Sequence, residues 1–168
     1  GGSGTDIPLI DPCEEATLPT AVVNDLLHNN NISSQVNVLE NHALNDNAEY
    51  GMAITDNNGS PVAQTPYTDG NSGTVTVNFP SSGNPLVAAH IHHKDIVAPP
   101  SAKDLYNALQ LIKDYPTYLG SMVFCFNGTK YTFVVKDRSK VIAFLNAHPR
   151  QQNLTADEKL FNEDFDIG

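Results

Sequence analysis

The first 93 residues contain no lysine or arginine, and the nine basic residues of the chain all lie between Lys94 and Lys159. Nineteen acidic residues give a formal net charge of −10 at pH 7. A surface of this sign repels the phosphate backbone, since nucleic-acid binding depends on clusters of basic side chains. We therefore expect no nucleic-acid partner.

Long apolar runs are also missing. No run approaches the ~18 residues of a membrane-spanning helix, so we expect no membrane insertion. Residues 1–4, Gly-Gly-Ser-Gly, have the composition of a linker and not that of a secretory leader. A start of this kind favours the C-terminal domain of a larger protein that is secreted or carried on a cell surface.

Cysteine is scarce as well. Cys13 and Cys125 are too few for a disulfide framework. Cys125 lies in the apolar run 122–126, which is typical of a small buried side chain. A single Cys13–Cys125 bridge that anchors the N-terminal segment stays open. Because neither cysteine is near the histidines discussed below in sequence, both are excluded from the candidate site.

The length of 168 residues fits one domain. We expect a flexible arm over residues 1–12 and a single domain over 13–168, and we divide the domain into a helical part (14–44), a core (48–148) and a helical tail (150–168). Periodicity and turn signals predict the core elements in this order: strands 49–54, 62–65, 74–79 and 86–92, helix 101–115, strands 121–126 and 130–135, and helix 138–147. Asn58-Gly59 and Asn127-Gly128 predict hairpins. This order indicates an α+β fold with a mixed, mostly antiparallel sheet flanked by helices.

Residues 90–104 hold the densest group of metal-binding side chain types. Because successive side chains of a strand alternate between its faces, one face of strand 86–92 carries Leu86, Ala88, His90 and His92. Asp104 lies in the first turn of the next helix, within reach of both histidines. Two histidines and one carboxylate leave a fourth tetrahedral position open, as in catalytic zinc sites. The sequence therefore predicts a Zn²⁺ site.

Other interpretations of these residues stay open. Ser101 and Asp104 fit a capping box, which is compatible with metal binding. Asp95 could replace Asp104 as the carboxylate ligand. His93 points away from His92, so we expect it to be solvated or to support the site without binding the metal.

The pattern His-x-His, a short loop and Ser-x-x-Asp resembles the core of the JAMM (MPN-plus) metallopeptidases. This resemblance implies that His90, His92 and Asp104 hold zinc, that Ser101 assists the oxyanion, and that a glutamate on an earlier strand transfers protons. Glu49, at the start of strand 49–54, is the best candidate for that glutamate. The fold implied is the JAMM or cytidine-deaminase type of α+β domain.

The resemblance covers about residues 49–137, with two departures. The family usually has seven residues between the second histidine and the serine, whereas this chain has eight, 93–100. His93 replaces the proline that usually follows the second histidine.

The activity implied is hydrolysis of an amide bond, peptide or isopeptide, in a peptide or protein substrate. Zinc would activate water, and Glu49 would act first as general base and then as general acid. Two alternatives remain: a non-catalytic binding module on the same fold, and a metal-dependent nuclease suggested by the run His92-His93-Lys94. The negative charge of the chain disfavours the nuclease.

Overall fold

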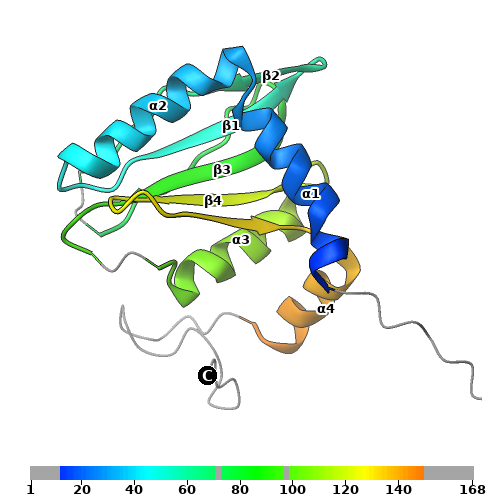
Figure 1. The fold of residues 1–168 in the computed structure, drawn as a ribbon. Coiled ribbons are helices and arrows are strands. Elements are labelled where there is room, and N and C mark those ends of the chain that lie inside the picture. Colours follow the sequence, from blue (N-terminus) through cyan, green and yellow to red (C-terminus); the bar gives the residue numbers. More distant parts are fainter. Residues whose placement is uncertain (1–11, 71–72, 97–98, 150–168) are drawn as a thin grey trace, which may run out of the picture.

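The computed structural model describes residues 12–70, 73–96 and 99–149, with side chains from residue 19 onward. The elements, in chain order, are α1 (Pro12–Leu27), α2 (Asn30–Asn45), β1 (Gly51–Asn57), β2 (Ser60–Ala63), β3 (Asn84–His92), α3 (Ala102–Asp114), β4 (Gly120–Cys125), β5 (Lys130–Val134) and α4 (Arg138–Ala147) (Figure 1). The five strands form one sheet in the order β2-β1-β3-β4-β5. Only β3 and β4 are parallel neighbours, so the predicted α+β fold with a mixed, mostly antiparallel sheet is confirmed.

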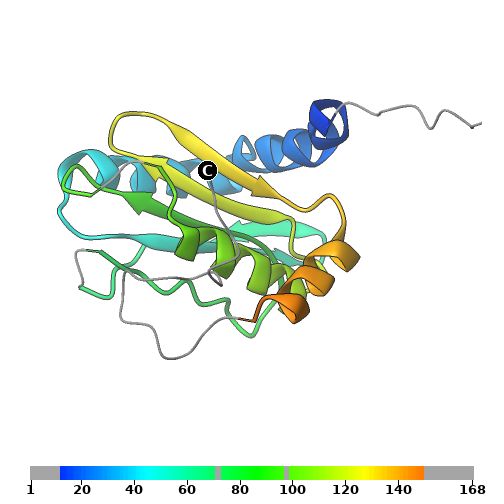
Figure 2. The same ribbon diagram turned by 90° about the horizontal axis from the view of Figure 1, so that it is seen from below.

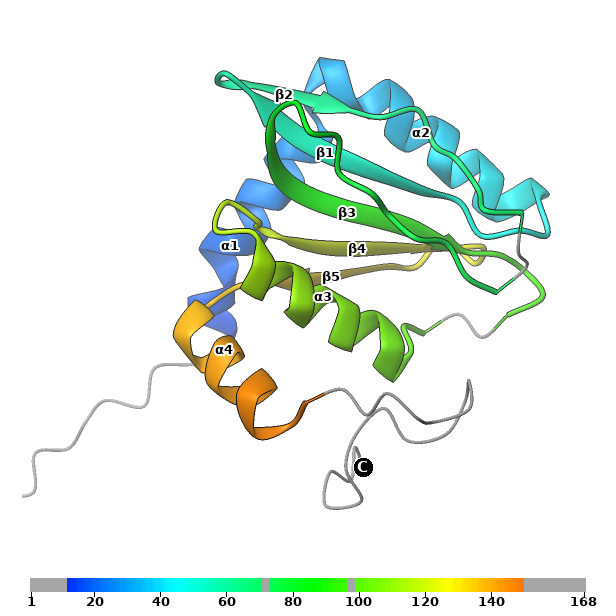
Figure 3. The same cartoon turned by 180° about the vertical axis from the view of Figure 1, so that it is seen from behind.

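Helices cover both faces of the sheet, which gives three layers (Figures 2 and 3). α1 and α2 pack on one face around a core that includes Val23, Leu39, Ile54, Ile91 and Phe124. α3 packs on the other face, and α4 lies against α3. In the described part of the chain, no helix is long and apolar enough to cross a membrane.

Two tight turns were predicted correctly. Asn58 and Gly59 link β1 to β2, and both have positive φ, 54° and 85°. Both central residues of a type I′ turn have positive φ, and the twist of this turn matches that of the two strands it joins. Gly128, with φ of 82°, makes the turn between β4 and β5.

The predicted strand 74–79 is wrong. The segment is not part of the sheet, although inward and outward side chains alternate along it as expected. Side chains replace a neighbouring strand on one of its edges: the Tyr67 hydroxyl donates to Thr76 O and accepts from Asn78 N–H, at 2.8 and 2.7 Å. Asp69 Oδ2 accepts from Thr76 N–H at 2.8 Å. The alternation of apolar and polar residues therefore indicates that one side of the segment is buried. It does not indicate that the segment pairs with another strand.

This extended segment lies across β1. A Cβ placed on Gly51 would be 2.8 Å from Val77 Cγ2 and 3.2 Å from Val75 Cγ1. Gly51 is opposite His90 in the sheet, so both valines lie on the sheet face that carries the histidines. Glycine is required here because the two chain segments approach closely.

Leu86 departs from the predicted face. The register between β1 and β3 shifts where Ile54 is opposite Val87 but Thr55 is opposite Pro85, which leaves Leu86 as the extra residue of a bulge. Leu86 therefore packs with the core under α1 and α2, away from the histidines.

Boundaries differ slightly at the N-terminus. α1 begins at Pro12, within the segment predicted as an arm. Asn29 caps α2, and its side chain accepts from Asn31 N–H at 2.9 Å. Most of the predicted arm and the whole predicted tail, 150–168, lie outside the described residues.

Candidate metal centre

His90 and His92 are held by the middle strand of the sheet. β3 is paired on both sides, with Gly51 of β1 opposite His90 and Cys125 of β4 opposite His92. The two imidazoles lie on the α3 face with their ring centroids 5.3 Å apart. A strand fixed by two neighbours presents these side chains with little freedom of the backbone.

Asp104 reaches the histidines from the start of α3. The predicted capping box is present: Ser101 Oγ accepts from Asp104 N–H at 3.2 Å, and Asp104 Oδ2 accepts from Ser101 N–H at 2.6 Å. The Ser101 hydroxyl also donates to Asp104 Oδ2, at 2.7 Å. The cap therefore fixes the carboxylate in the orientation that faces β3.

The three side chains converge. His90 Nε2 lies 3.3 Å from Asp104 Oδ1, and His92 Nε2 lies 3.4 Å from Asp104 Oδ2. Within the described residues, this is the one group of three or more side chains whose ligand atoms all lie within 4.8 Å of one another. Ligands about 2.0–2.1 Å from a tetrahedral zinc are separated by about 3.3 Å, so the two spacings between a histidine and Asp104 fit such an ion.

Charge and burial fit a cation at this point. Burial alone would raise the pKa of Asp104, but the close contacts of its carboxylate with His90 and His92 and the hydrogen bond from Ser101 N–H outweigh burial and hold the pKa well below its ordinary range. His90 Nε2 is buried, and it lies 3.3 Å from Asp104 Oδ1 without good hydrogen-bond geometry. A buried nitrogen is costly unless it is well bonded. A metal ion between His90 and Asp104 would bind both.

Glu49 lies beside this group. Its side chain is only 7% exposed, and it precedes Gly51, the residue opposite His90, by two positions. Burial raises the pKa of Glu49, while the nearby charges of His90 and His92 lower it in part. β1 begins two residues later than predicted, yet the alternation places Glu49 on the face of the histidines.

The structure shows which carboxylate, Asp95 or Asp104, lies beside the two histidines, and it shows where His93 lies. Asp95 has a side chain that is 57% exposed, and it is not in the ligand group, so Asp104 is the carboxylate that the fold brings to the histidines. His93 is 1% exposed and also outside the group; its Nδ1 accepts from Asp95 N–H at 3.2 Å. A buried position that orders the loop fits the expectation of a supporting role and excludes a solvated one.

Cys125 is the neighbour that sequence reasoning missed. It is buried on β4, opposite His92 in a parallel pair, and therefore on the same face. Burial raises the pKa of the Cys125 thiol, and the charge of Asp104 raises it further. No local signal could have found it, because the pairing joins segments 33 positions apart. In the structure Cys125 is not part of a disulfide, so the bridge to Cys13 that the sequence left open is not formed.

Comparison of the chain with family models, with curated proteins and with solved structures gave no match. The fold and the site together define an α+β domain with a candidate metal centre made by His90, His92 and Asp104.

Proposed function

We propose that the protein is a JAMM-like zinc hydrolase that cleaves an amide bond, peptide or isopeptide, in a peptide or protein substrate. One observation carries the proposal: the ligand atoms of His90, His92 and Asp104 lie within 4.8 Å of one another, and buried Glu49 lies beside them. The three metal-binding side chains alone would be equally compatible with a metal that has only a structural role. An adjacent carboxyl group that can exchange protons favours catalysis.

Zinc suits the donor set. Two imidazole nitrogens and one carboxylate oxygen are common zinc ligands, and three protein ligands leave a position for a reactant. When bound, the ion supplies a Lewis acid that activates water at neutral pH. His90 and His92 would hold it from β3, and Asp104 from α3.

Glu49 is the proposed proton acceptor. A raised pKa brings the pKa of the carboxyl group closer to neutral pH. A group with such a pKa can both take a proton from water and return it to a leaving amine. Burial supplies this shift, and it also shields the group from bulk water.

Ser101 is the proposed donor to the oxyanion that forms at the scissile carbonyl. Its hydroxyl now donates to Asp104 Oδ2, so it must turn toward the substrate to fill this role. The backbone N–H of Ser101 also donates to Oδ2, and it would keep the carboxylate oriented when the hydroxyl turns.

Metal analysis combined with a hydrolysis assay tests the proposal. Protein purified without chelators should contain one zinc per chain by elemental analysis, and His92→Ala should lose it. His28→Ala is the matched control, because His28 is an exposed histidine that follows α1, with its Nδ1 2.8 Å from Asn24 O, and is outside the ligand group. Quenched peptide and isopeptide libraries supply the substrates.

The outcomes separate the alternatives. Zinc uptake without cleavage of either library would favour a binding module. Cleavage of plasmid DNA with magnesium would favour a nuclease. Absence of zinc in purified protein, with no uptake on titration, would remove the metal centre altogether.

A further inference from the structure

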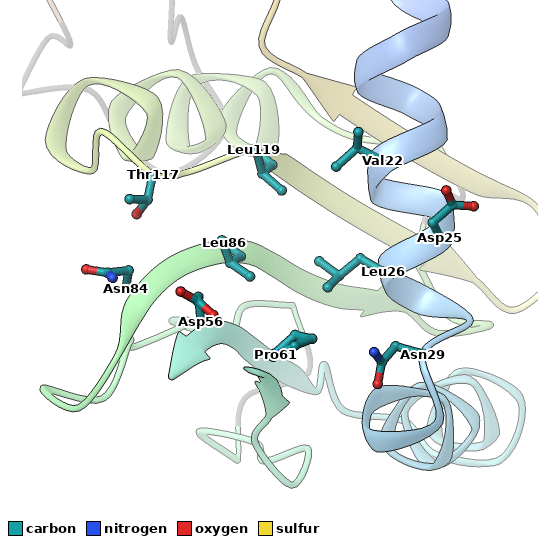
Figure 4. A pocket seen from close by; sticks show the side chains of 10 residues that line it. All are labelled: Val22, Asp25, Leu26, Asn29, Asp56, Pro61, Asn84, Leu86, Thr117 and Leu119. Carbon is teal, nitrogen blue, oxygen red and sulfur yellow. The ribbon is translucent and has the colours of Figure 1, made fainter. Parts of the chain in front are cut away.

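A pocket of about 440 Å³ opens on the sheet face opposite the candidate metal centre (Figure 4). It lies between α1 and the adjoining ends of the strands, and it is lined by Val22, Asp25, Leu26, Asn29, Asp56, Pro61, Asn84, Leu86, Thr117 and Leu119. Its volume falls in the range of about 300–1,000 Å³ that is usual for small-molecule sites.

The pocket is separate from the metal centre. Leu86 is four residues before His90 on β3, a separation of about 13 Å along a strand. The bulge in β3 turns Leu86 toward α1, whereas His90 faces α3. A ligand in the pocket would therefore not touch the metal ligands.

Apolar side chains form the base of the pocket, and one carboxylate, that of Asp56, lies among them. Leu26 of α1, Leu86 of β3 and Leu119, which directly precedes β4, converge, and Val22 closes one side (Figure 4). Asp56 lies between Leu86 and the neighbouring strand β2.

No charge offsets that carboxylate. Asp56 is half-buried, and within the described residues it has no ion pair. No lysine or arginine lines the pocket, which comes largely from the half of the chain that contains neither. Asp25 adds a second negative charge at the rim.

We propose that this pocket binds a small organic cation: an apolar body that packs on the three leucines and carries an ammonium group paired with Asp56. Burial of the apolar body supplies most of the affinity, because transfer of apolar surface out of water is favourable. The Asp56 carboxylate attracts the positive charge, and the net charge of −10 repels anions.

Three probes of matched shape test the proposal: 2-phenylethylamine, 2-phenylethanol and phenylacetate. Each is titrated into methyl-labelled protein and followed by NMR. The amine should shift the methyl signals of Val22, Leu26, Leu86 and Leu119, and it should bind about threefold to fivefold more tightly than the alcohol, the worth of one partly screened ion pair. Phenylacetate should not bind.

Variants locate the charge effect. Asp56→Asn should lower the affinity for the amine to that for the alcohol, and unchanged alcohol binding shows that the pocket is intact. Asp25→Asn is the matched control, because the Asp25 carboxylate points away from the leucines (Figure 4) and the preference should remain. Val22→Trp, at a half-exposed position, should block every probe.

Equal affinity for amine and alcohol, shifts at other methyl groups, or a preference that survives Asp56→Asn would each overturn the proposal.

Discussion

At the residue scale, Asp104 uses its two carboxylate oxygens differently. Oδ2 accepts both donors of the helix cap and also lies 3.4 Å from His92 Nε2, whereas Oδ1 lies 3.3 Å from His90 Nε2. The same side chain therefore orients the start of α3 and offers an oxygen to a metal. This arrangement agrees with the expectation that the capping box is compatible with metal binding.

Ser101→Ala should weaken the cap. We expect the free energy of unfolding of the zinc-free protein, measured in urea, to fall by about 1 kcal/mol, the usual worth of an N-cap side chain. Ser101→Asn is the matched control, because asparagine caps a helix as well as serine and should restore most of the stability. If Ser101→Asn also hydrolyses substrate at the wild-type rate, the hydroxyl has no role at the oxyanion.

Glu49→Gln should separate proton transfer from metal binding. The variant should keep its fold and one zinc per chain, but kcat should fall by about 10²–10⁴-fold, the usual contribution of a positioned acid–base group. Glutamine preserves the shape and removes the basic oxygen. Asp95→Asn, which alters an exposed carboxylate outside the ligand group, should leave both zinc and rate unchanged. Full activity of Glu49→Gln with zinc bound would sink this assignment.

At the scale of elements, the contact between β1 and segment 74–79 shapes the side of the site next to Glu49. Gly51→Ala should lower the free energy of unfolding by about 1–3 kcal/mol, as overpacking does, because the new methyl group would meet Val77.

The double variant tests the cause. Val77→Ala in the Gly51→Ala background should recover part of the loss, measured as a coupling energy in a double-mutant cycle. Additive effects of the two changes would show that the valine does not rest on Gly51.

Local signals were sufficient for most elements. Helix 138–147 was predicted with the bounds that the structure has, and the hairpin turns and the Ser101 cap were also correct. These features depend on residues close in sequence, such as Asn-Gly pairs with positive φ or a serine three positions before an aspartate.

The errors arose where distant segments meet. Segment 74–79 has the alternation of a strand, but the Tyr67 hydroxyl occupies one of its edges. The position of Leu86 depended on a bulge, and the place of Cys125 beside His92 on a parallel pairing. The ligand set of the site was accessible from sequence because its three members lie within fifteen residues, 90–104.

At the scale of the whole molecule, a metal ion at this site would connect two layers of the fold. His90 and His92 belong to the central strand of the sheet, and Asp104 belongs to the helix layer that covers it. Between them, residues 93–101 form a connection without helix or strand where the structure describes it. A bound ion would therefore hold the start of α3 against β3, next to a connection whose described residues have no regular structure of their own.

Removal of zinc should consequently destabilise the whole domain. A ligand that binds only the folded state raises the free energy of unfolding by about 4 kcal/mol when its free concentration is about 1,000 times Kd. We expect EDTA to lower the Tm of the wild-type protein and added zinc to restore it, measured by circular dichroism. His92→Ala should show a Tm that neither treatment changes, because two remaining ligands bind zinc weakly, whereas His28→Ala should respond like the wild type. If EDTA changes the Tm of His92→Ala as much as that of the wild type, the stabilising ion binds elsewhere, and His90, His92 and Asp104 do not hold it.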